Sequence, residues 1–146
     1  MIQRLQSVFL LLASGSCFGL FGTDAANSAA PITASALFAD TEFDLYDDPL
    51  LISLFALAGL IFLADIFLFN NRKLQIKLSL LALLLAVAGV AYGSYRFATD
   101  AAASTASEIT PDLGVVLPVL TLVFALLANK YIKADEKLVR SADRLR

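Results

Sequence analysis

Four long runs of apolar residues, at 5–22, 49–69, 74–95 and 113–132, alternate with more polar segments along the chain. The two adjacent runs at 49–69 and 74–95 are apolar on all sides rather than along one helical stripe, which is typical of helices surrounded by lipid. As a helix, the run 49–69 would extend roughly 31 Å at about 1.5 Å per residue, enough to cross a hydrocarbon core about 30 Å thick. The pattern predicts an all-α fold, an integral membrane bundle of four transmembrane helices.

The polar segments indicate where these helices begin and end. Asn70-Asn71-Arg72-Lys73 must turn outside the lipid, because its backbone groups and charges need water, so 49–95 is predicted to form a hairpin. Asp48-Pro49 is a favourable helix start, and Pro118 is predicted to kink the fourth helix. We expect a four-helix domain at 1–132, followed by a charged cytoplasmic helical tail at 133–146.

Charge predicts the orientation of the bundle. With four spans, ten of the eleven Lys and Arg residues lie on one side, and Arg96 is the exception. Nine of the thirteen acids lie on the other side, in the segments 23–48 and 96–112. Because positively charged loops stay in the cytoplasm, we expect both termini to be cytoplasmic in the inner membrane of a bacterium.

The first run is open to a second interpretation. Arg4, an apolar core and the small residues that follow also resemble a cleaved signal peptide. A lipoprotein signal at Cys17 is disfavoured, because Ser14-Gly15-Ser16 lacks the usual Leu three positions upstream. We favour an uncleaved first helix.

Composition narrows the possible functions. The chain of 146 residues is 59% hydrophobic and 16% charged, with a net charge of −2, so no strongly basic nucleic-acid surface is expected. It has no His and a single cysteine, which makes metal sites and a disulfide framework improbable. It carries no phosphate-binding loop and no nucleophile elbow. We expect neither enzymatic activity nor a cofactor.

Asp65 is the first candidate for a functional residue, because a carboxylate inside a membrane helix costs free energy and usually has a role. It lies five residues before Asn70, roughly 8 Å inside the helix end. It is either a proton or ion site, a local ion pair with Lys73 or Lys77, or a carboxylate reached by interfacial water.

Two small-residue motifs are candidates for helix packing. Gly15 and Gly19, and likewise Gly89 and Gly93, follow the G-x-x-x-G spacing that lets two helices approach closely. Ala82 and Ala86 extend the small face of the third helix. We expect the first and third helices to pack against each other here, and contact with another subunit is the alternative.

The tail offers candidate interaction residues. Glu136 and Arg140 have the spacing of a helical ion pair, and apolar positions recur on one side. We expect the tail to dock on a partner subunit or on the inner leaflet, through a mixed set of basic and apolar side chains: Lys137, Leu138, Arg140, Arg144 and Leu145.

Three segments carry a family resemblance: MIQRLQ at 1–6, NRKLQ at 71–75 and DEKLVRSADRLR at 135–146. With these, the chain resembles a family of small bacterial four-helix integral membrane proteins classed as a domain of unknown function. The resemblance covers the whole chain. It implies the four-helix topology and assigns no activity.

Two functions remain open at this point. One is an accessory, structural or assembly subunit that packs against a larger membrane complex. The other is a small oligomeric proton or cation transporter or channel that uses Asp65. The expected partners are the lipid bilayer and either a larger membrane protein complex or further copies of the chain, with no nucleic acid.

Overall fold

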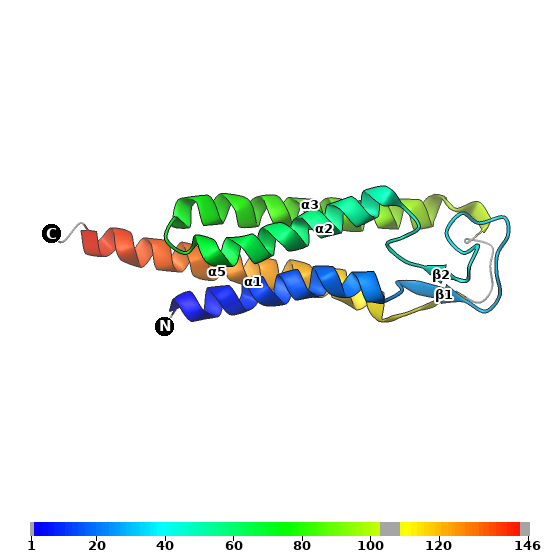
Figure 1. Ribbon diagram of the computed structural model, residues 1–146, viewed down its shortest axis with the longest axis horizontal. Coiled ribbons are helices and arrows are strands. Elements are labelled where there is room, and N and C mark those ends of the chain that lie inside the picture. Colours follow the sequence, from blue (N-terminus) through cyan, green and yellow to red (C-terminus); the bar gives the residue numbers. More distant parts are fainter. Residues whose placement is uncertain (1, 103–108, 144–146) are drawn as a thin grey trace.

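The computed structural model describes residues 2–102 and 109–143 and is dominated by four long antiparallel helices (Figure 1). They are α1 (Ile2–Gly19), α2 (Pro49–Asp65), α3 (Arg72–Thr99) and α5 (Val116–Asp143). Short 3-10 turns flank them: η1 (Leu20–Gly22), η2 (Ile66–Leu68) and η3 (Leu113–Val115). Four helices in the described part of the chain are long and apolar enough to cross a membrane. The prediction of a four-helix membrane bundle is confirmed.

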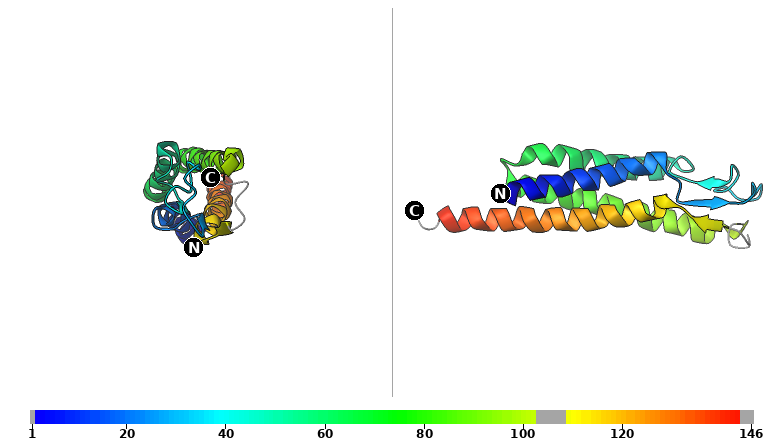
Figure 2. Two further views of the ribbon diagram at one scale, coloured as in Figure 1. Left: turned by 90° about the vertical axis from the view of Figure 1, so that its right-hand side faces the viewer. Right: turned by 90° about the horizontal axis from the view of Figure 1, so that it is seen from below.

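The four helices form a square in which neighbours along the chain lie side by side (Figure 2, left). α1 packs on α2 and α5, and α3 packs on α2 and α5, so α1 and α3 occupy opposite corners. The prediction that the first and third helices pack against each other is therefore wrong. The short turn between α2 and α3 makes these two helices neighbours, and the contacts of α1 with α2 and α5 leave the first and third helices diagonal.

The helix starts follow the polar signals in part. Asp48 caps α2 by accepting a hydrogen bond from the Leu50 amide (2.9 Å), and Pro49 is the first helical residue, as predicted. Asn71 caps α3 in the same way through the Leu74 amide. The predicted kink at Pro118 is wrong, because α5 begins at Val116. Pro118 then lies in the first turn, where a missing N–H breaks no helical bond.

A small antiparallel sheet joins the two connections at the far end of the bundle (Figure 1). Its strands are β1 (Ala26–Ser28), β2 (Glu42–Phe43) and β3 (Ile109–Pro111), in the order β2-β1-β3. Ala26 pairs with Phe43 on one side and with Pro111 on the other. The sheet ties the two acidic segments together, opposite the end where both chain termini lie.

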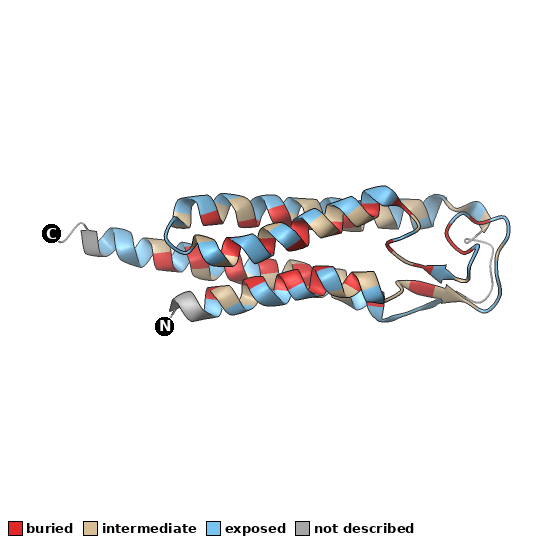
Figure 3. Cartoon of the chain, in the orientation of Figure 1, coloured by how far each residue is buried: buried red, intermediate tan, exposed pale blue. Residues whose placement is uncertain are grey.

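Buried and exposed positions alternate along each helix (Figure 3). Small and large apolar residues fill the interior, and large apolar residues also cover the outside. Ala82 and Ala86 of α3 are fully buried, as are Ala125 and Ala128 of α5. Leucines on the outer faces are about half exposed, among them Leu57, Leu60, Leu84 and Leu126. Such a continuous apolar exterior would be a liability in water and suits contact with lipid.

The four glycines of the G-x-x-x-G motifs have separate roles. A Cβ on Gly19 would meet the Leu117 side chain of α5 at 3.1 Å, whereas Gly15 has open space around it. Gly89 lies under the Phe55 ring of α2, which a Cβ would meet at 2.8 Å, and Gly93 faces Leu51 of the same helix. The glycines of α3 therefore admit side chains from α2. A contact between Gly15 and another subunit stays a prediction.

Candidate functional site

Asp65 ends α2 inside the bundle and is fully buried. Neither of its carboxylate oxygens has a hydrogen-bond partner among the described residues. Lys73 and Lys77 are exposed on α3, and Arg72 pairs instead with Asp135 of α5 (2.6 Å). The predicted local ion pair is therefore wrong, whereas the alternative of a carboxylate reached by interfacial water stays a prediction for this fully buried side chain.

Two further polar side chains, Gln6 and Gln75, are fully buried in the same end of the bundle. Gln75 of α3 donates from Nε2 to the backbone carbonyl of Asp65 (3.0 Å), and its Oε1 is left without a partner among the described residues. Gln6 of α1 is fully buried, with both amide atoms unpartnered in the described part of the chain. We call Gln6, Asp65 and Gln75 the polar centre. It holds five of the six buried side-chain atoms that lack a partner within residues 2–102 and 109–143.

Contacts between helices place the polar centre at one level of the bundle. Ser14 of α1 donates to the Gly59 carbonyl of α2 (2.9 Å), which fixes how these two antiparallel helices align. From that contact toward the chain termini, Gln6 lies roughly 12 Å along α1, and Asp65 lies roughly 9 Å along α2, at 1.5 Å per residue. The two residues therefore lie within about one helical turn of each other along the bundle axis.

A neighbouring hydrogen bond continues the polar interior. Ser79 lies one turn beyond Gln75 on α3 and donates to Oδ1 of Asn129 on α5 (2.7 Å), while Asn129 donates to the Ala125 carbonyl. All four helices thus contribute polar side chains near this level. Because unpaired polar groups in a low-dielectric interior are costly, the polar centre is a place where a proton or a cation would be bound favourably.

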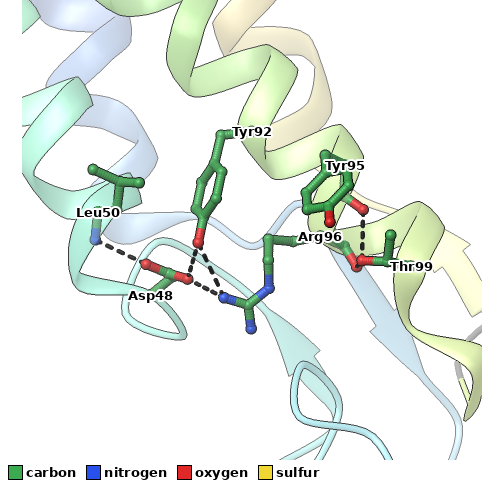
Figure 4. A network of polar contacts seen from close by, with 6 residues as sticks. All are labelled: Asp48, Leu50, Tyr92, Tyr95, Arg96 and Thr99. Atoms are coloured by element: carbon green, nitrogen blue, oxygen red, sulfur yellow. Dashed lines mark hydrogen bonds and ion pairs between the residues drawn. The ribbon is translucent and has the colours of Figure 1, made fainter.

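A second network lies at the opposite end, where α2 begins (Figure 4). Besides capping α2, Asp48 accepts a hydrogen bond from the Tyr92 hydroxyl (2.8 Å) and forms an ion pair with Arg96. Arg96 also donates to the Tyr92 hydroxyl (3.3 Å). Arg96, the one basic residue that the charge pattern placed on this side, therefore has a structural partner. Its ion pair with Asp48 links α3 to the start of α2.

The pKa values of the two adjacent carboxyls at the start of α2, Asp47 and Asp48, are shifted in opposite directions. The hydrogen bond from Tyr92, aided by Arg96, lowers the pKa of Asp48, so the stability it contributes is present at neutral pH and is lost on acidification. Burial raises the pKa of Asp47 from 3.8 to about 6, with further repulsion from Asp44. The stability that Asp47 contributes is therefore present in acid and is lost as the pH rises through about 6.

An apolar cavity of about 710 Å³ lies near the sheet, among the outer ends of the helices. Phe55 and Gly89 line it from α2 and α3, and Val119 lines it from α5. The polar lining residues are Thr23, Asp44 and Ser94. Its size is within the usual range of small-molecule sites, and its walls suit an apolar group rather than an ion.

The predicted tail is a direct continuation of α5, which runs without a break to Asp143. The Glu136–Arg140 ion pair is present at 2.6 Å. Lys137 and Leu138 are exposed next to it. Arg144 and Leu145 lie outside the described residues.

Gln6 and Gln75 were not predicted from the sequence as neighbours of Asp65. Each lies near the end of an apolar run, where a glutamine is usually interfacial and solvated. A weak signal was available, because Gln75 and Ser79 are spaced four residues apart and so share a helix face. Only the alignment of the helices shows that these side chains are buried at one level of the bundle.

Residues 2–145 match the family described as a domain of unknown function (DUF4293), and the chain belongs to that family. The resemblance drawn from the three sequence segments is thereby confirmed. No curated protein and no solved structure matches the chain. The protein is a small four-helix membrane protein of a family without an assigned function.

Proposed function

We propose that this chain is a non-enzymatic accessory, structural or assembly subunit that packs against a larger membrane complex. In this proposal it resides in the inner membrane of a bacterium, with both termini in the cytoplasm. The observation that carries the proposal is the projecting end of α5, which extends beyond the rest of the bundle (Figure 1).

The Arg72–Asp135 ion pair marks the point where α5 leaves the bundle. From Asp135 to Asp143 the helix continues for roughly 12 Å at 1.5 Å per residue. Leu138 and Val139 are 54% and 37% exposed there, beside the exposed Lys137. An ordered helix with apolar and basic side chains that the bundle leaves uncovered is suited to docking on another protein.

Removing the end of the helix tests this role. Truncation after Glu136 retains the Arg72–Asp135 ion pair, so we expect a protein that inserts and folds normally but no longer co-purifies with its complex under mild detergent extraction. Leu138→Glu together with Val139→Glu should have the same effect, because charges replace the apolar contact surface. Ser141→Glu on the same segment is the matched control. Full co-purification and complementation by the truncated chain would contradict the proposal.

A second candidate is a small oligomeric proton or cation transporter or channel that uses Asp65. The specific observation in its favour is the buried carboxylate, which lacks an ion pair among the described residues. Four helices enclose little space alone, and an oligomer would be needed to form a continuous path.

Replacing Asp65 by Asn tests the transport role. Asparagine has nearly the same shape, so we expect the bundle to stay folded with a modest change in thermal stability. Proteoliposomes with the wild-type chain should then show proton or sodium flux that Asp65→Asn abolishes. Asp112→Asn, at the other end of the molecule, should keep wild-type flux. Absence of flux from the wild-type oligomer would leave only the accessory role.

A further inference from the structure

We propose that the polar centre is a sodium-binding site, with the Asp65 carboxylate and the side-chain oxygens of Gln6 and Gln75 as ligands. The inference deepens the second candidate function, since it concerns the same Asp65 and names the ion and two further ligands. Binding does not require transport, and a binding experiment in detergent separates the two.

Acceptor atoms are in excess in the polar centre. Four of its five unpartnered atoms are oxygens, within the described part of the chain: two from Asp65 and one each from Gln6 and Gln75. With Asp65 ionised, the only unused donor group among them is the amide nitrogen of Gln6. Carboxylate and amide oxygens are the ligands that hard cations prefer, so all four oxygens are of the kind that a bound cation takes.

The charge of Asp65 also lacks a protein partner. When ionised, Asp65 brings one negative charge to a buried site, and the basic side chains described on the helices of the bundle are occupied or exposed. Arg72 is held by Asp135, whereas Lys73 and Lys77 of α3 are exposed. Lys130 and Lys133 of α5 are exposed as well. A bound cation is therefore the charge partner that the described residues do not provide.

The ligand set selects a monovalent ion. A single carboxylate balances one positive charge, and divalent ions usually draw on several carboxylates. In the described part of the chain, no three Asp, Glu, His or Cys residues gather into a metal site. The neutral oxygens of Gln6 and Gln75 complete an oxygen shell without adding charge, which suits sodium.

The test is sodium-dependent thermal unfolding of the whole purified chain in detergent, at fixed pH and fixed ionic strength. Choline chloride replaces sodium chloride stepwise, and tyrosine fluorescence or circular dichroism reports unfolding, since the chain has no Trp. Because a ligand that binds only the folded state stabilises it, we expect the midpoint to rise by several degrees and to saturate with sodium. Equilibrium binding of radioactive sodium should approach one ion per chain.

Variants assign the effect to the polar centre. Asp65→Asn should remove the sodium response, and Gln75→Met or Gln6→Met should raise the half-saturating concentration at least tenfold while the protein still folds. Glu136→Gln, on the projecting end of α5, should respond like the wild type. Equal midpoints in sodium and choline would overturn the inference. So would a response to pH alone, which would mean that a proton neutralises Asp65.

Discussion

Replacing Asp48 by Ala is expected to lower the free energy of unfolding by about 2–4 kcal/mol, because one carboxylate serves three partners. It caps α2 through the Leu50 amide, accepts from the Tyr92 hydroxyl and pairs with Arg96. Its removal leaves a guanidinium that is only 28% exposed without this counter-charge. The measurement is thermal or denaturant unfolding in detergent, followed by helix circular dichroism.

Asp48→Asn is the matched control for this prediction. Its side-chain oxygen can still cap α2, whereas the charge that holds Arg96 is lost, so its destabilisation should lie between wild type and Asp48→Ala. Arg96→Ala should resemble Asp48→Asn, since it removes the same ion pair. Equal stability of Asp48→Ala and the wild type would show that the network does not hold α3 to the start of α2.

Gly114→Ala is expected to destabilise the protein by about 1–3 kcal/mol through overpacking. The Gly114 amide donates a hydrogen bond to the Asp24 carbonyl (2.9 Å). The strand β1 begins two residues after Asp24, at Ala26. A Cβ would lie 2.6 Å from the Asp24 carbonyl carbon and 2.9 Å from the Ala25 nitrogen. These are backbone atoms, so relief requires moving the strand or the start of α5.

Gly15→Ala provides the contrast. Gly15 is exposed on α1, and no atom of another helix lies within 4 Å of the place that an alanine methyl group would take. Alanine should therefore be neutral or stabilising by up to about 1 kcal/mol. Both variants are compared by the same unfolding measurement. If Gly114→Ala were as stable as Gly15→Ala, the close approach between η3 and the start of β1 would be wrong.

The helices could be predicted from the sequence because a helix that crosses lipid needs about twenty apolar residues in a row. The helix start at Asp48-Pro49 could be predicted because a helix cap depends only on residues that are adjacent in the sequence. The sheet could not be predicted, since strands of two and three residues are too short to show a periodic pattern. The role of Arg96 was hidden for a different reason. Its partner lies 48 positions away, and only the antiparallel hairpin brings the two together.

The candidate site was half predictable. A lone acid in an apolar run identified Asp65, because its cost in lipid is independent of the rest of the fold. Its surroundings depend on which helices are neighbours, and the expected pairing of the first and third helices was wrong. The glutamines of α1 and α3 are buried at one level because the four helices form a square around a common interior.

Membrane topology of the whole chain is the decisive measurement, because a four-span bundle must place both termini on one side. A reporter that works only in the cytoplasm should be active when fused after Arg146, and a reporter that works only after export should be inactive there. Inserted between Ala29 and Ala30, the exported reporter should be active and the cytoplasmic reporter inactive. The mature protein should retain its first helix. An export-dependent reporter active at Arg146, or a mature N-terminus near residues 24 to 31, would contradict the four-span bundle.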